Sequence, residues 1–174
     1  MTTHNLSVLV SNKPGVLARV AGLFSRRGFN IDSLAVGPTE KPGVSRMTLS
    51  ADVAEPAVLE QLVKQLNKLI EVYKVIELEP AAITREMVLV KVRSTAHDRG
   101  QIIDLIGLFR AHAVDVGSDS ITIEATGTVD KLDGLLTLLA PFGIIEIATS
   151  GLVALDRGGK SIDEKRRPAL SRNR

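Results

Sequence analysis

The segment from Ser11 to Phe24 contains the residues that are best suited to holding a small ligand. Its pattern predicts a strand end, a tight loop and a helix start, with Pro14 in the first helical turn, where its missing N–H needs no partner. Backbone N–H groups at a helix start lack intrahelical acceptors, and the helix dipole favours an anion there. Gly15 lets a ligand approach the backbone, and the Asn12 side chain can cap the helix or contact the ligand. The segment is therefore a candidate site for a small carboxylate.

A helix start with a good cap and no ligand explains the same loop equally well. Asn30 favours a ligand, because it is a polar residue between Phe29 and Ile31 at the start of a strand predicted for Asn30 to Val36. If two copies pair along that strand, Asn30 of one lies near the helix start of the other. Its amide offers an acceptor to an ammonium and donors to a carboxylate, which would suit a zwitterionic amino acid. The alternative is that Asn30 is only a turn residue after Gly28.

Catalysis has little support in the sequence. The three histidines, His4, His97 and His112, have no metal-ligand spacing and no serine or aspartate arrangement that indicates a triad. There is no glycine-rich dinucleotide motif and no phosphate-binding lysine motif, and the carboxylates are spread along the chain. We therefore expect no catalytic residue, no metal site and no cofactor in this chain.

Composition narrows the possible classes further. The chain has 174 residues, of which 44% are hydrophobic, so a packed core is expected. Aromatic residues make up only 3%, which argues against binding to single-stranded nucleic acid through stacked rings. The absence of cysteine excludes disulfides and thiolate metal sites. No signal peptide and no apolar run of about 20 residues are visible, so we expect a soluble, cytoplasmic protein without membrane contact.

The high isoelectric point, about 9.0, comes from the end of the chain. Lys160 to Arg174 has six basic and two acidic residues, a net charge of +4, so the remainder is close to neutral with a net charge of −2. A basic tail can contact nucleic acid or an anionic surface. The simpler interpretation is a disordered, solvated tail over residues 159–174.

Hydrophobic spacing predicts the same order of elements twice, strand–helix–strand–strand–helix–strand. In the first half the strands are expected at residues 6–11, 30–36, 46–53 and 72–78, with helices after Pro14 and from Glu55-Pro56. In the second half they are expected at 87–92, 113–117, 121–126 and 144–148, with a helix capped by Asp98 and another at 130–139. The fold class is therefore α+β, two tandem ferredoxin-like βαββαβ units.

The predicted domains are residues 1–79, a linker at 80–84, a second unit at 85–158, and the tail at 159–174. In a split βαββαβ sheet the second strand lies at an edge, where unpaired backbone groups can pair with a neighbour. We therefore predict a homodimer that joins two sheets through the segment Asn30 to Val36.

Several motifs resemble the regulatory (small) subunit of acetolactate synthase, also called acetohydroxyacid synthase, whose amino-terminal part is an ACT domain. The matching residues are Asn12, Pro14-Gly15-Val16-Leu17, Arg27-Gly28-Phe29-Asn30-Ile31, Ser33-Leu34, Ser45-Arg46-Met47-Thr48, Arg85 to Val92, Gly127, Lys131-Leu132-Asp133 and Ser150-Gly151. They cover roughly residues 4–158, so the resemblance is to this subunit rather than to ACT domains in general.

The resemblance implies a non-catalytic partner of a large catalytic subunit that carries thiamine diphosphate, magnesium and FAD. In the family the small subunit activates the large one and confers feedback inhibition by valine in branched-chain amino-acid biosynthesis. The effector lies between two ACT domains, and the C-terminal unit is implicated in activation. The valine contacts implied for this chain are Asn12, Lys13, Pro14, Gly15, Val16 and Leu17 from one copy and Asn30 and Ile31 from the other. Lys13 and Pro14 are expected to contribute backbone contacts.

Three other interpretations remain open at the level of sequence. One is a free-standing tandem-ACT regulator that senses amino acids without an enzyme partner. The second is a small enzyme on a ferredoxin-like fold, since fold alone does not decide function. The third is a nucleic-acid binder that acts through the basic tail.

Overall fold

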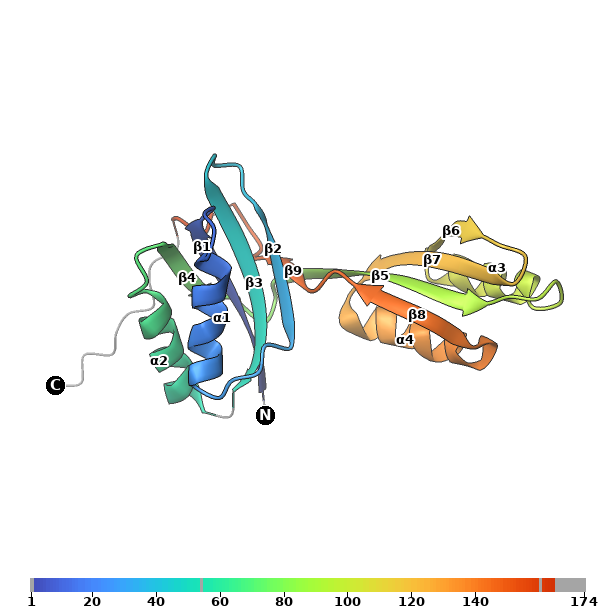
Figure 1. Cartoon of the computed structure of the whole chain (residues 1–174), viewed down its shortest axis with the longest axis horizontal. Coiled ribbons are helices and arrows are strands. Elements are labelled where there is room, and N and C mark those ends of the chain that lie inside the picture. Colours follow the sequence, from blue (N-terminus) through green and yellow to red (C-terminus); the bar gives the residue numbers. More distant parts are fainter. Residues whose placement is uncertain (1, 54, 160, 165–174) are drawn as a thin grey trace. The chain divides into compact units, whose positions relative to one another are not determined.

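The chain folds into two units, each built from one antiparallel sheet and two α-helices (Figure 1). The structure is a computed structural model that describes residues 2–53, 55–159 and 161–164. The first unit comprises the residues up to Ile83 together with the described residues from Ala154 onwards, and the second comprises Thr84–Val153.

The first unit has the predicted βαββαβ order. Its elements are β1 (Thr2–Ser11), α1 (Val16–Arg26), β2 (Ser33–Pro38), β3 (Val44–Val53), α2 (Pro56–Leu66) and β4 (Val72–Glu77). The four strands are arranged β2-β3-β1-β4, so β2 lies at an edge as predicted. The strand predicted for Asn30 to Val36 is displaced, because β2 begins only at Ser33.

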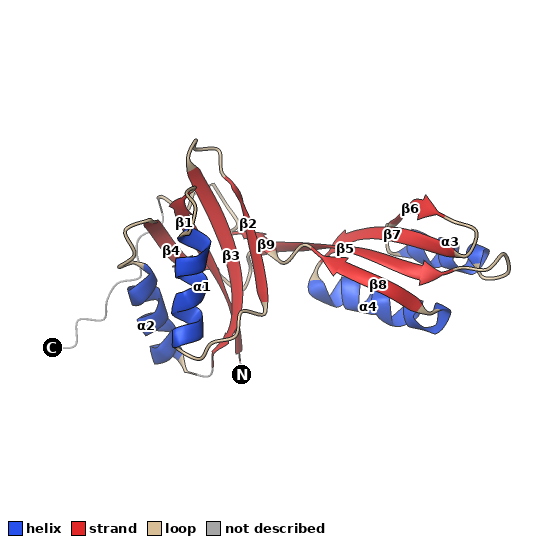
Figure 2. Ribbon diagram, viewed as in Figure 1, coloured by secondary structure: helices blue, strands red, loops and turns tan. Residues whose placement is uncertain are grey.

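Both helices of the first unit cover the same face of its sheet (Figure 2). Alternation along β1 directs Leu6, Val8 and Val10 to this face, where they pack with Val20 and the fully buried Phe24 of α1. α2 begins as expected, with Pro56 in its first turn, and carries the predicted Glu60–Lys64 ion pair at 2.8 Å. The apolar stripes of the helices therefore make the first core.

The opposite face of the same sheet is covered by the C-terminal segment, which we define as residues 154–159 and 161–164. Ala154 and Ile162 of this segment form a second apolar cluster with residues of β1, β4 and the following turn, namely Leu9, Ile76 and Leu78. Asp163 accepts a hydrogen bond from Lys41, which raises the pKa of the Lys41 ammonium, and its carbonyl accepts one of 2.8 Å from the Lys74 ammonium.

This packing changes two expectations from the sequence. Residues 154–158 were assigned to the second unit, whereas their contacts place them with the first. The disordered tail was expected from residue 159, yet residues 161–164 form a turn in which Ile162 is only 7% exposed. The rest of the predicted tail, Lys160 and residues 165–174, lies outside the described residues.

The second unit repeats the order of the first. Its elements are β5 (Ile83–Arg93), α3 (Arg99–Leu108), β6 (His112–Val116), β7 (Ser120–Gly127), α4 (Val129–Leu139), the 3-10 helix η1 (Ala140–Phe142) and β8 (Ile144–Thr149). The strands are arranged β6-β7-β5-β8, and the short β9 (Val153–Leu155) also pairs with β5. β5 begins inside the segment predicted as a linker, at Ile83.

The core of the second unit lies between its sheet and its two helices. It is built from Val88, Val90 and Val92 of β5 with helix residues such as Ile102 and Leu135, all fully buried. The predicted cap of α3 is not formed: the Asp98 side chain caps no backbone N–H and instead accepts a hydrogen bond of 2.7 Å from the Thr95 hydroxyl. The apolar spacing decides this helix without the cap.

Candidate effector-binding site

A short loop joins the end of β1 to the start of α1. The Asn12 N–H donates to the Gly43 carbonyl in the β2–β3 turn at 2.8 Å, and the Lys13 N–H donates to the Ser11 carbonyl at 2.9 Å. These two bonds fix the path of the backbone, while the side chains of Asn12, Lys13 and Pro14 stay exposed. The loop is therefore held from its backbone and presents its outer surface to solvent.

The helix start is more open than the sequence predicted. Pro14 precedes the helix and does not lie in its first turn, and Gly15 is the N-cap residue with a φ of 82°. Such a left-handed conformation is natural for glycine and strained for most other residues. A Cβ added at Gly15 would find no heavy atom within 4 Å. The space in front of the helix start is thus free for a ligand.

No side chain caps α1, so the interpretation of this loop as a well-capped helix is wrong. The first backbone bond of the helix runs from the Arg19 N–H to the Gly15 carbonyl at 3.1 Å. In the part of the chain that the structure describes, the N–H groups of Leu17 and Ala18 have no backbone acceptor and lie at the positive end of the helix dipole. Ala18 was not among the predicted site residues, because only the observed helix start identifies its amide.

Leu17 and Val16 have different environments within the first turn. Val16 is buried in the core, whereas Leu17 is 42% exposed. Beside them, Arg19 forms an ion pair with Glu71, which lies just before β4. Sequence reasoning missed this pair, because the two residues are distant in the sequence and only the β1–β4 pairing brings them together.

Asn30 and Ile31 lie in the loop between α1 and β2. Gly28, with a φ of 74°, ends the helix in a left-handed conformation, as predicted. Asn30 is exposed and its Nδ2 donates to Asp32 Oδ1 at 2.7 Å, while Ile31 packs partly against the first core. Asn30 therefore precedes the edge strand instead of starting it.

The two halves of the predicted site lie at opposite ends of α1. The helix has eleven residues, which span about 16 Å at 1.5 Å per residue. Gly15 lies at its start and Asn30 four residues beyond its end. One copy of the chain therefore cannot bring both to the same small ligand, and any shared site needs Asn30 of a second copy.

Comparisons with known proteins agree over both units. A family model described as the AHAS small subunit-like ACT domain matches residues 6–74, and one described as the small subunit of acetolactate synthase matches residues 85–158. The acetolactate synthase small subunit of Mycolicibacterium smegmatis is 59% identical over 161 residues, which is 92% of this chain and 94% of that protein. The chain belongs to the acetolactate synthase small-subunit family.

Two more distant relatives extend the agreement. The probable acetolactate synthase small subunit of Archaeoglobus fulgidus is 51% identical over 90% of this chain and 98% of its own length. The crystal structure of the acetolactate synthase small subunit from Thermotoga maritima matches with a TM-score of 0.85 and 40% identity, over 92% of this chain and 100% of that one. The predicted family and the predicted α+β fold of two βαββαβ units are confirmed.

Membership of this family makes the chain a regulatory subunit, as predicted, and not the subunit that performs the chemistry. Among the described residues, no group of three or more His, Cys, Asp or Glu side chains could hold a metal ion. Within the same residues, no helix is long and apolar enough to cross a membrane.

Proposed function

We propose that this small subunit activates the thiamine diphosphate-dependent catalytic subunit of acetolactate synthase and makes it sensitive to inhibition by valine. The observation that carries the proposal is the uncapped start of α1, where exposed N–H groups lie behind an open Gly15. A carboxylate of a free amino acid is the right size and charge for those N–H groups. Thiamine diphosphate, magnesium and FAD would all belong to the catalytic subunit.

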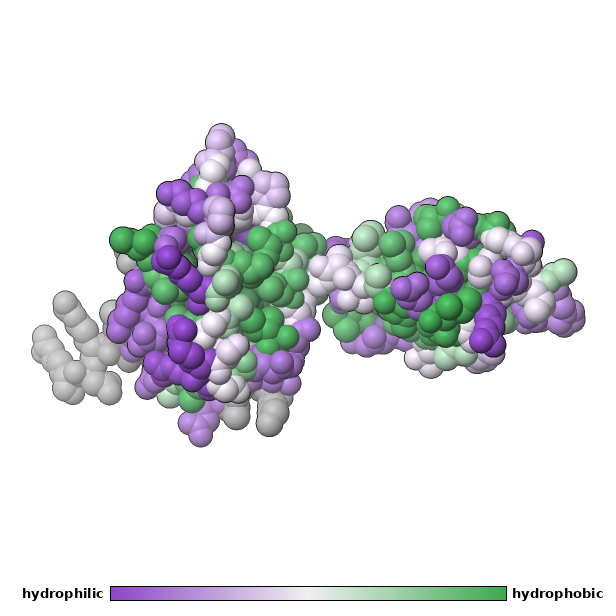
Figure 3. All heavy atoms as spheres, viewed as in Figure 1, coloured by the Kyte–Doolittle hydropathy of each residue, from purple (hydrophilic) through white to green (hydrophobic). Residues whose placement is uncertain are grey.

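The effector site is completed by a second copy of the chain. The loop from Asn12 to Leu17 of one copy would hold the valine carboxylate, and Asn30 with Ile31 of the other would contact the ammonium and the side chain. An edge strand with unpaired backbone groups provides a way to form this dimer. Figure 3 shows hydrophobic residues at the surface beside β2, and the apolar side chains there include Leu34 and the 47% exposed Val36.

Inhibition follows by linkage between the two binding events. If valine binds the dimer arrangement that activates the catalytic subunit less well, valine shifts the population towards it. A coupling free energy of about 1 to 3 kcal/mol is typical of such regulation. Discrimination among valine, leucine and isoleucine should be modest, since one methylene is worth about 1 to 3 kcal/mol. A biosynthetic role of this kind places the protein in the cytoplasm.

The decisive experiment compares two substitutions at one atom. Gly15→Asp and Gly15→Asn add side chains of the same size, and both residue types tolerate a positive φ better than most. Only Gly15→Asp adds a negative charge where the effector carboxylate would lie. We expect Gly15→Asp to abolish valine inhibition and Gly15→Asn to weaken it, with activation of the catalytic subunit retained by both.

Two readouts separate the parts of this proposal. Calorimetric titration of the purified chain with valine measures effector binding, and acetolactate formation by the reconstituted enzyme measures activation. If Gly15→Asp still responds to valine at the wild-type concentration, the site lies elsewhere. If the catalytic subunit does not co-purify with the chain, the alternative of a free-standing amino-acid-sensing regulator is favoured instead.

A further inference from the structure

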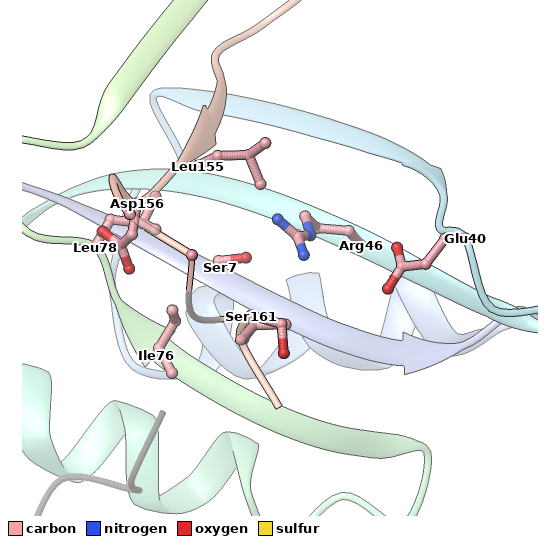
Figure 4. Close-up of a pocket in the computed structure, with 11 residues that line it drawn as sticks. Ser7, Glu40, Arg46, Ile76, Leu78, Leu155, Asp156 and Ser161 are labelled. Atoms are coloured by element: carbon pink, nitrogen blue, oxygen red, sulfur yellow. The ribbon is translucent and has the colours of Figure 1, made fainter. Parts of the chain in front are cut away.

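A second cavity lies on the face of the first sheet that is turned away from the helices. It has a volume of about 300 Å³ and is enclosed between strands of the first unit and the C-terminal segment (Figure 4). Ser7 and Arg46 supply its polar wall, and Ile76, Leu78 and Ile162 supply its apolar wall. None of these residues belongs to the proposed valine site.

Ser7 is a buried hydroxyl without a partner. Alternation along β1 turns it away from the first core, and the C-terminal segment leaves it only 1% exposed. Among the described residues, its Oγ has no hydrogen-bond partner. An unsatisfied buried hydroxyl costs about 1 to 3 kcal/mol, so a bound acceptor that reached this group would recover stability.

Arg46 brings a positive charge to the same cavity. It lies on β3, half-buried, and within the described part of the chain its guanidinium makes no hydrogen bond or ion pair. Figure 4 shows the guanidinium extending over the sheet towards the Ser7 hydroxyl. A guanidinium offers two parallel N–H donors, the geometry that matches a carboxylate.

The remaining walls limit what the anion can be. Ile76, Leu78 and Ile162 are each less than 9% exposed and offer a surface for a hydrocarbon group. Two acidic residues, Glu40 and Asp156, also line the cavity. Because one guanidinium faces two carboxylates, a doubly charged phosphate is disfavoured and a singly charged ligand is favoured.

We propose that this cavity binds a small monocarboxylate with a short branched apolar body. The carboxylate would accept hydrogen bonds from Arg46 and Ser7, and the apolar body would pack against Ile76 and Ile162. This is a second ligand site, separate from the proposed valine site and not dependent on it. Because Ile162 belongs to the C-terminal segment, binding here would also hold that segment on the sheet.

The test uses the full chain with Gly15→Asp, so that the proposed valine site cannot contribute. Four probes are titrated by calorimetry and by ligand-observed NMR: 3-methylbutanoate, valine, 2-methylpropylamine and inorganic phosphate. We expect 3-methylbutanoate to bind and 2-methylpropylamine and phosphate not to bind. Binding of valine as well would identify an amino acid as the ligand, because the site then accepts an ammonium; its failure would identify a carboxylate without one.

Substitutions locate the binding in this cavity. Arg46→Gln should weaken 3-methylbutanoate binding about tenfold or more, the loss expected for a charged hydrogen bond. Ser7→Ala removes only the hydroxyl and should weaken binding several-fold without unfolding the sheet. Arg85→Gln is the matched control, because Arg85 is an exposed arginine outside the cavity and should leave binding unchanged. No binding of 3-methylbutanoate at millimolar concentration, or equal binding by Arg46→Gln, would overturn the proposal.

Discussion

Asn30 and Asp32 share a hydrogen bond of 2.7 Å, which runs from the amide Nδ2 of Asn30 to Oδ1 of Asp32. One donor of the amide is therefore used inside the chain, and its carbonyl oxygen remains available as an acceptor. The carboxylate of Asp32 also places a negative charge beside that oxygen. This arrangement suits the ammonium of an amino acid better than its carboxylate, which the helix start of the other copy would hold.

Substitutions at this pair should separate charge from hydrogen bonding. Asp32→Ala leaves the Asn30 amide in place but frees its orientation and removes the nearby negative charge, so valine affinity should fall by about fivefold to tenfold. Asn30→His removes the amide and should abolish valine inhibition while activation persists. Calorimetry with valine and inhibition curves of the reconstituted enzyme measure both effects. Unchanged valine affinity in Asp32→Ala would show that the pair does not face the ammonium.

Pairing of two copies through β2 is expected to depend on the surface of that edge strand. Val36 is 47% exposed on β2, and a charge there should oppose extension of the sheet. We expect Val36→Lys to raise the dimer dissociation constant about tenfold or more, as measured by sedimentation at micromolar concentration. Ile70→Lys is the matched control: Ile70 is 90% exposed in the turn after α2, so it should leave the dimer intact. A wild-type chain that sediments as a monomer would contradict the dimer itself.

The repeated fold and the first half of the site could be predicted from the sequence because they depend on local patterns. The alternation of Leu6, Val8 and Val10 and the helical spacing that includes Val20 and Phe24 place these residues in one core, as observed. The exposed Gly15 likewise follows from the local sequence, since glycine permits the positive φ found there.

The remainder depends on contacts between distant residues. Ile162 is an isolated apolar residue in a polar, charged stretch, and nothing nearby in the sequence shows that it packs on Leu9 and Ile76. The displaced start of β2 has a similar cause, because the Asp32 N–H bonds to the Ser50 carbonyl on the neighbouring β3. Local propensity cannot fix such registers, which are decided by the partner strand.

The C-terminal segment should contribute to the stability of the first unit. Ile162→Ala removes a buried side chain that packs on the sheet, and it should lower the free energy of unfolding by about 2 kcal/mol. The chain has no tryptophan and a single tyrosine, Tyr73 on β4, so tyrosine fluorescence during urea denaturation reports on this unit. Deletion of residues 165–174 is the control and should leave the same transition unchanged. Equal stability of Ile162→Ala and the wild type would show that the segment is only loosely attached.

A mixing experiment tests directly whether each valine site takes residues from two copies. Gly15→Asp damages the helix start and Asn30→His damages the other half, so neither variant alone should bind valine. In a mixed dimer one site combines both damaged halves. The other site combines the intact Asn30 of the first variant with the intact helix start of the second. Mixing should therefore restore binding, with at most one valine per mixed dimer, measured by calorimetry after the two variants have exchanged subunits. A site contained within one copy would remain damaged in every combination, and mixing would restore nothing.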